Sequence, residues 1–147
     1  MPLRRRLWNM KAVPLAILFL VVAALAAPPQ SPEDSHLGVV YFWKAKPGKL
    51  EEYNKYIREF AEPIDEEARR GGAFLSVTTY VSTRPDAPWT HMRIFVLKDR
   101  AQLQGLSAAL DAAKLRLHPD EAQRAQKDAY AATLRDFVSQ EEVEILR

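Results

Sequence analysis

The chain has 147 residues and no cysteine, with 21 lysines and arginines against 19 aspartates and glutamates. The absence of cysteine excludes disulfides, thiol catalysis and thiolate metal sites. Four of the basic residues lie in the first eleven positions, so the rest of the chain carries 17 basic against 19 acidic residues. A slightly acidic chain without a basic cluster argues against nucleic-acid binding.

The first 26 residues have the three-part pattern of a secretory signal peptide. A basic start is followed by an apolar run over residues 12–26, and Ala24-Leu25-Ala26 fits the A-x-A cleavage pattern. We expect cleavage after Ala26, export to the periplasm or the extracellular space, and an extended linker over residues 27–36. The apolar run is shorter than the roughly 20 residues that span a bilayer, so no membrane anchoring is expected after cleavage. Retention of residues 12–26 as an anchor is the alternative.

Residues 37–45 are rich in β-branched and aromatic side chains and predict a strand. The next segment predicts a helix, because apolar residues recur every three or four positions. This stripe consists of Leu50, Tyr53, Ile57, Phe60 or Ala61, and Ile64. Pro63 should kink or break the helix, and Gly71-Gly72 should end it.

Residues 73–82 and 89–97 predict an antiparallel hairpin of two strands. Asp99 and Gln102 resemble a capping box that opens a helix. A further helix should start near Pro119 and run to about Asp136, with a packing face of small residues. That face is Ala122, Ala125, Ala129 and Ala132. Alternation around Val143 and Ile145 predicts a last strand. The order is βαββααβ, which predicts a ferredoxin-like α+β domain over residues 37–147.

Each predicted strand has two sets of side chains, because alternate residues point to opposite faces of a sheet. The apolar sets, which we expect to lie under the helices, are Met92, Ile94 and Val96, and Leu75, Val77 and Val81. The mixed sets of aromatic and polar residues are Trp89, His91, Arg93 and Phe95, and Phe74, Ser76, Thr78 and Tyr80, joined by Tyr41 and Trp43. We expect this mixed face to be free of helices and to pair with a second copy in a two-fold dimer.

The strand order, the Lys-Pro-Gly-Lys turn at residues 46–49 and the strand over residues 89–97 followed by Asp99 resemble the dimeric α+β barrel superfamily. That group includes antibiotic-biosynthesis monooxygenase-like, EthD-like and NIPSNAP-like domains. The resemblance implies a homodimer with a pocket between sheet and helices or inside the barrel. It transfers no catalytic residue, because the superfamily shares none.

His91 and Arg93 are the candidate catalytic residues. An imidazole can move protons near neutral pH, and an arginine can pair with a carboxylate or an enolate. Tyr41, Trp43, Tyr80 and Trp89 are the candidate ligand-binding residues on the same predicted face. No metal site or cofactor is predicted, because the three histidines are far apart in the sequence.

Two functions are compatible with these residues. The first is an exported homodimer that binds a small aromatic or carboxylated molecule, with cofactor-free proton transfer or oxygenation in which His91 is the base. The alternative is a non-catalytic structural or accessory dimer, in which the same residues only fill the interface, where Trp, Tyr and Arg are enriched.

Overall fold

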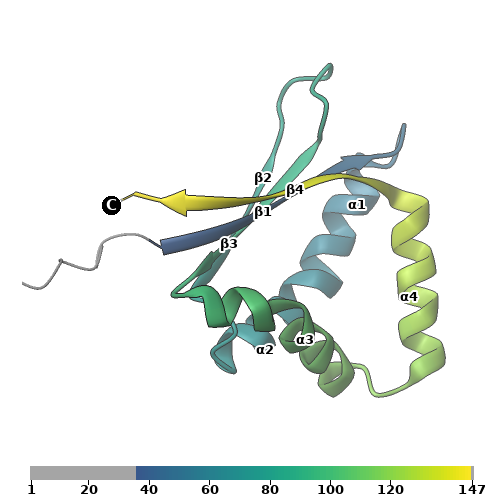
Figure 1. Cartoon of the computed structure of the whole chain (residues 1–147). Coiled ribbons are helices and arrows are strands. Elements are labelled where there is room, and N and C mark those ends of the chain that lie inside the picture. The colour runs from purple at the N-terminus through teal and green to yellow at the C-terminus, as the bar shows by residue number, and fades with distance from the viewer. Residues whose placement is uncertain (1–35, 147) are drawn as a thin grey trace, which may run out of the picture. The chain divides into compact units, whose positions relative to one another are not determined.

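The computed structural model describes residues 36–146 and contains a four-stranded sheet with helices on one side (Figure 1). The strands are β1 (His36–Ala45), β2 (Ser76–Val81), β3 (His91–Leu97) and β4 (Arg135–Ile145). The helices are α1 (Leu50–Tyr56), α2 (Glu62–Arg70), α3 (Arg100–Leu117) and α4 (Glu121–Leu134). The predicted signal peptide and all but the last residue of the predicted linker lie outside the described residues.

The strand order in the sheet is β2-β3-β1-β4, and every neighbouring pair is antiparallel. The two central strands, β1 and β3, are far apart in the sequence and pair over seven residues, from Leu37 opposite Leu97 to Trp43 opposite His91. This is the predicted ferredoxin-like α+β arrangement. His36, which the sequence places in the linker, is the first residue of β1 and lies opposite Ile145.

One continuous helical segment runs from α1 to α2 through a π-helical turn, Ile57–Ala61. The predicted kink at Pro63 therefore takes the form of a widened turn just before the proline, with the Glu62 amide bonded to the Ile57 carbonyl. Such turns absorb an irregularity without ending the helix. The predicted apolar stripe is largely buried, although Leu50 at its start is exposed.

The predicted helix ends agree with the structure where they depend on local contacts. The Asp99 side chain accepts a hydrogen bond from the Gln102 amide and caps α3. Gly72 has φ +81°, a left-handed conformation suited to glycine, directly after α2. The predicted start of α4 near Pro119 is two residues early. The helix begins at Glu121, because Asp120 is the residue that caps it.

The assignment of the two sheet faces was wrong for β3, and for Tyr41 and Trp43 of β1, which lie opposite Arg93 and His91. His91, Arg93, Phe95 and Leu97 of β3 are buried beneath the helices, whereas Met92, Ile94 and Val96 are only half-buried. Helix α2 supplies a carboxylate and α1 an amide to the polar members of the buried set, so these side chains are satisfied without water. The open face therefore carries the apolar set.

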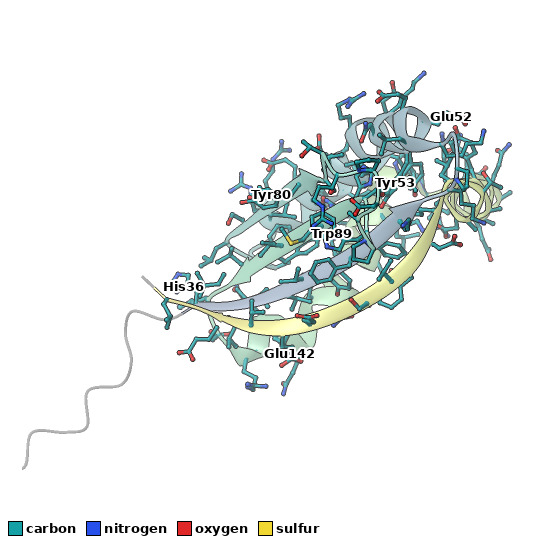
Figure 2. All side chains as sticks on the ribbon, turned by 90° about the horizontal axis from the view of Figure 1, so that it is seen from above. His36, Glu52, Tyr53, Tyr80, Trp89 and Glu142 are labelled. Carbon is teal, nitrogen blue, oxygen red and sulfur yellow. The ribbon has the colours of Figure 1, made fainter. Side chains whose placement is uncertain are left out.

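For β2 the predicted faces are right, with Val77 and Val81 on the helix side, but placing Tyr80 on one face with His91 and Arg93 was wrong. Thr79 lies opposite Arg93, and Tyr80 lies opposite Met92, so Tyr80 belongs to the open face. Trp89 packs against Phe42, whose partner on β3 is also Met92. Figure 2 views the sheet from the side away from the helices and shows Tyr80 and Trp89 on that side.

The predicted packing face of α4 was also wrong, because Ala122, Ala125, Ala129 and Ala132 are all exposed. Ala131 and Leu134 are the buried residues of this helix. The chain leaves the helix at Arg135, earlier than predicted, and enters β4, which curves along the edge of the sheet (Figure 2). The second half of α4 contacts the other helices, because Asp128 pairs with Lys114 of α3 and Tyr130 packs against Tyr56 of α1.

Candidate functional site

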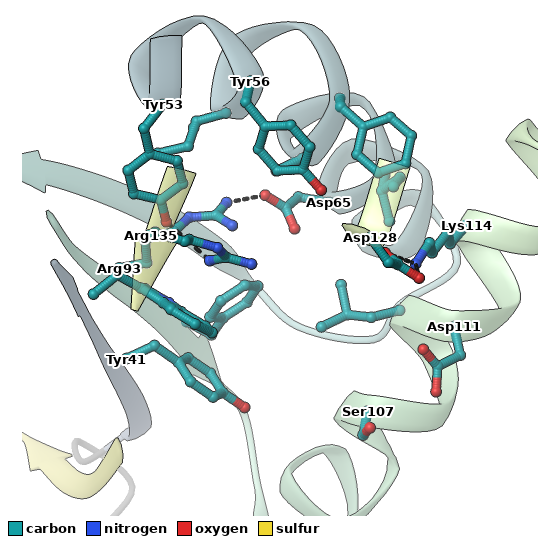
Figure 3. Close-up of a pocket in the computed structure, with 17 residues that line it drawn as sticks. Tyr41, Tyr53, Tyr56, Asp65, Arg93, Ser107, Asp111, Lys114, Asp128 and Arg135 are labelled. Atoms are coloured by element: carbon teal, nitrogen blue, oxygen red, sulfur yellow. Dashed lines mark hydrogen bonds and ion pairs between the residues drawn. The ribbon is translucent and has the colours of Figure 1, made fainter. Parts of the chain in front are cut away.

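A pocket of about 300 Å³ lies between the sheet and the helices (Figure 3). Its aromatic walls are Tyr41 and Trp43 of β1, Tyr53 and Tyr56 of α1, Phe60 of the π-helical turn, and Phe95 of β3. Its charged groups are Asp65, Arg93, Asp111, Lys114, Asp128 and Arg135. The π-helical turn also contributes Ile57 and Ala61, so the irregular part of the long helix faces the pocket.

A buried ion pair between Arg93 and Asp65 forms one wall of the pocket. The two residues are 8% and 4% exposed, and Nη2 of Arg93 donates to Oδ2 of Asp65. Nε of Arg93 donates to Oγ1 of Thr79 at 3.1 Å, so the guanidinium is held by one residue of β2 and one of α2. Burial raises the pKa of Asp65, and the charge and hydrogen bond of Arg93 oppose this effect.

Arg135 lies at the junction of α4 and β4 and points into the pocket (Figure 3). Its guanidinium carbon is 3.5 Å from the centre of the Trp43 ring, and Nη1 donates to the Tyr53 hydroxyl at 2.9 Å. Among residues 36–146, no carboxylate forms an ion pair with Arg135. The pocket therefore holds a cation that rests on an aromatic face and has no acidic partner there.

Three tyrosine hydroxyls add hydrogen-bonding capacity to the pocket. Burial raises the pKa of Tyr56 to about 12 and also raises the pKa values of Tyr41 and Tyr53. For Tyr53, Arg135 opposes the effect of burial. These hydroxyls stay protonated at neutral pH and can donate hydrogen bonds to an anionic oxygen.

An ion pair between Lys114 of α3 and Asp128 of α4 crosses the rim of the pocket. The ammonium group is 2.5 Å from one carboxylate oxygen and 2.7 Å from the other. Asp111 also lies on this rim and is exposed. The arginines thus lie toward the sheet, whereas the carboxylates of Asp111 and Asp128 lie toward solvent.

His91 lies beneath Tyr53 and does not line this pocket. It is 0% exposed, and both of its ring nitrogens are hydrogen-bonded. Nε2 lies 2.8 Å from Oδ1 of Asn54, which can only accept, so Nε2 carries the proton and Nδ1 accepts from the Thr90 hydroxyl. Burial, reinforced by Arg135 and Arg93, lowers the pKa of His91 to about 4. The imidazole is neutral at pH 7.

The structure separates the predicted site residues into three groups. Tyr41, Trp43 and Arg93 line the pocket, His91 lies under it, and Tyr80 and Trp89 lie on the opposite face of the sheet. The charged pocket residues that sequence reasoning did not select include Asp65 and Arg135, and Tyr53 was predicted only as part of the apolar stripe of its helix. One signal was available for Asp65, because it lies four residues after Ala61 and three before Ala68, on the apolar side of the helix.

No protein-family model matches the sequence, and no curated protein matches it. HapK from Hahella chejuensis is similar in structure, with a TM-score of 0.52, 9% sequence identity, and coverage of 75% of this chain and 92% of that chain. The fold is ferredoxin-like. The predicted ferredoxin-like fold is therefore confirmed by the strand order, and HapK is similar to this chain in fold.

Two further solved structures are similar to a lower degree. PA3566 from Pseudomonas aeruginosa has a TM-score of 0.45 and 15% identity, covering 80% of this chain and 98% of that chain. A dimeric protein of unknown function with a ferredoxin-like fold from Bacteroides fragilis has a TM-score of 0.44 and 11% identity, covering 77% and 96%.

Within residues 36–146, no group of three or more His, Asp or Glu side chains is placed to hold a metal ion. No helix in the same part of the chain has the length and apolar character needed to span a membrane.

Proposed function

We propose that the pocket binds a small aromatic molecule that carries a carboxylate or a similar anion, and that the protein works as a homodimer. The observation that carries the proposal is Arg135, a cation laid on Trp43 with no acidic partner among the described residues. A volume of about 300 Å³ suits a molecule with a single ring and lies at the lower end for small-molecule sites.

The aromatic body and the anionic group of the proposed ligand are each inferred from a different part of the pocket lining. Rings from β1, α1 and β3 favour an aromatic body, because aromatic groups gain from edge and offset contacts. Arg135 and the hydroxyls of Tyr53 and Tyr56 favour an anionic group near the sheet. Arg93 contributes positive charge to the same side, although Asp65 already neutralises it.

Binding is tested by calorimetric titration of the full chain with benzoate, phenylacetate and phenylpyruvate, and with neutral phenylacetamide. We expect the anions to bind and Arg135→Gln to weaken them about tenfold or more, because a hydrogen bond to a charged group contributes roughly 1.5–3 kcal/mol. Arg58→Gln changes an exposed arginine outside the pocket and should leave the affinity unchanged. Failure of all three anions to bind, or equal affinity for phenylacetamide and phenylacetate, would contradict the proposal.

The open face of the sheet supports the homodimer. Phe42, Met92, Ile94 and Val96 are half-buried there, and Tyr80 is 48% exposed, so an apolar patch crosses three neighbouring strands. A second copy of the same face would cover it in a closed two-fold arrangement.

The dimer is tested by light scattering of the eluting protein during size-exclusion chromatography. Ile94→Lys should give the mass of one chain where the unaltered protein gives two, because a charge at the centre of the face would lose its water in the dimer. Leu115→Lys alters an exposed leucine of α3 away from this face and should remain dimeric. A single-chain mass for the unaltered protein would refute the homodimer.

The alternative is a non-catalytic accessory dimer. It is favoured by the position of His91, which has both nitrogens occupied and no access to the pocket. Absence of ligand binding together with an intact dimer would select it. Export and cleavage after Ala26 remain proposals drawn from the sequence.

A further inference from the structure

We propose that Asp65 is a catalytic base in this pocket and that the ligand class is narrower than aromatic anions in general: aromatic 2-oxo acids, or related compounds with an acidic C–H beside a carbonyl. The inference rests on the proposed function. In this proposal Asp65, and not His91, is the group that accepts a proton from the ligand.

Asp65 has one carboxylate oxygen held and one available. Arg93 binds Oδ2, whereas none of residues 36–146 donates a hydrogen bond to Oδ1. Figure 3 shows Asp65 extending from α2 with one oxygen toward Arg93 and the other toward the middle of the pocket. A bound molecule would therefore meet an oriented carboxylate oxygen with a free lone pair.

The surroundings of Asp65 favour proton transfer. The residue is 4% exposed, and burial makes its carboxylate a better proton acceptor than an aspartate in water, since it raises the pKa. Arg93 opposes this rise by favouring the ionised carboxylate, and its guanidinium, which also donates to Thr79, holds Oδ2 of Asp65 in place. His91 lacks such a free acceptor, because Thr90 and Asn54 occupy both ring nitrogens.

A route for the proton lies on the other side of the same ion pair. Asp65 and Arg93 also line a second pocket of about 240 Å³, which contains Glu62, Glu66 and Arg69 of α2. Asp65 is thus a lining residue of both the aromatic pocket and this outer, polar one. A proton taken up on the inner side can exchange with water on the outer side.

The chemical step balances without a cofactor. For phenylpyruvate, the C3–H bond breaks, the proton moves to Oδ1 of Asp65, and the electron pair moves onto the C2 carbonyl oxygen. The resulting enolate oxygen would be stabilised by the cation of Arg135 or by a tyrosine hydroxyl. Return of a proton from Asp65, after exchange with solvent, restores the keto acid, and nothing is oxidised or reduced.

The test measures exchange of the C3 hydrogens of phenylpyruvate in D₂O by proton NMR, with the full chain and with Asp65→Asn. We expect the unaltered protein to accelerate exchange and the variant to lose about 100-fold or more of that acceleration, since a positioned acid or base contributes typically 10²–10⁴-fold. Phenylpyruvate should bind the variant at least as tightly, because Arg135 is unaltered and the charge of Arg93 is no longer neutralised. Glu59→Gln, which alters an exposed acid that lines neither pocket, should retain exchange.

A second measurement needs no variant and so stands even if Asp65→Asn fails to fold. The catalysed exchange of the unaltered protein should decline as the pH falls, with a midpoint above the ordinary aspartate value of 3.8. Titratable and charged residues from every neighbouring element line the two pockets with Asp65. In the aromatic pocket they are Tyr41, Tyr53, Tyr56, Arg93, Asp111, Lys114, Asp128 and Arg135, and in the outer pocket they are Glu62, Glu66 and Arg69. Of these, Arg93 lowers the pKa of Asp65 and Glu62 raises it.

The outcomes separate this inference from the proposed function. If phenylpyruvate binds and the unaltered protein does not accelerate exchange, or Asp65→Asn retains the acceleration, Asp65 is not the base and the binding proposal stands. If the catalysed exchange does not slow as the pH falls, Asp65 is likewise not the base. If neither phenylpyruvate nor the other aromatic anions bind, the proposed function fails and this inference fails with it.

Discussion

Acidification from pH 6.5 to pH 4 should remove up to about 3 kcal/mol of folding free energy through His91 alone. In the folded protein burial lowers the pKa of this residue to about 4, against an ordinary value of 6.5. Between pH 6.5 and pH 4, His91 is protonated in the unfolded chain and neutral in the folded chain. The free energy of unfolding therefore falls as the pH falls. Above pH 6.5 His91 is neutral in both states and costs no stability. The loss of unfolding free energy grows as the pH falls and is nearly complete at about pH 4.

Urea denaturation of the full chain and of His91→Gln at several pH values measures this effect. The substitution should destabilise the protein at pH 7, because it disturbs the hydrogen bonds to Asn54 and Thr90. The difference between the two proteins should then shrink by about 3 kcal/mol toward pH 4, since the variant has no imidazole to protonate. Other groups titrate in both proteins and cancel in the difference. A difference that stays constant with pH would contradict the assignment.

Replacement of Arg93 by methionine should cost about 3–5 kcal/mol at neutral pH, because it leaves the buried Asp65 carboxylate without its partner. The cost should decrease on acidification. Without Arg93 the folded-state pKa of Asp65 rises further above its unfolded value, and the folded variant binds more protons than the unfolded chain in that window. The stability of the variant relative to the unaltered protein therefore improves as the pH falls.

Equilibrium unfolding at pH 7 and pH 5 tests this expectation. The double variant Arg93→Met with Asp65→Leu should recover most of the loss, since a buried pair and an apolar replacement are often close in stability. Arg69→Met breaks an exposed ion pair with Glu66 and should change stability little. A loss for Arg93→Met as small as that for Arg69→Met would mean that the buried pair does not stabilise the fold.

The parts of the fold that could be predicted from the sequence depend on neighbours along the chain. Asp99 caps a helix through an amide three residues away, and Gly72 ends one through its own backbone. The strands follow from composition, and their order with the helices is enough to indicate a ferredoxin-like sheet. The candidate site could be predicted from the sequence only in part. Alternation in β3 places His91 and Arg93 on one face, but it does not show which elements cover that face.

The sequence by itself determined the element types, the order of strands and helices, and the division of each strand into two sets of side chains, because each depends on local periodicity and turn chemistry. Only the tertiary structure decided which set lies under the helices. Asp65 and Asn54, 28 and 37 residues from their partners, satisfy Arg93 and His91 there. Burial of polar groups is favourable only when such partners arrive, and long-range packing supplies them. The same packing brings Arg135, at the junction of α4 and β4, onto Trp43 in the wall of the pocket.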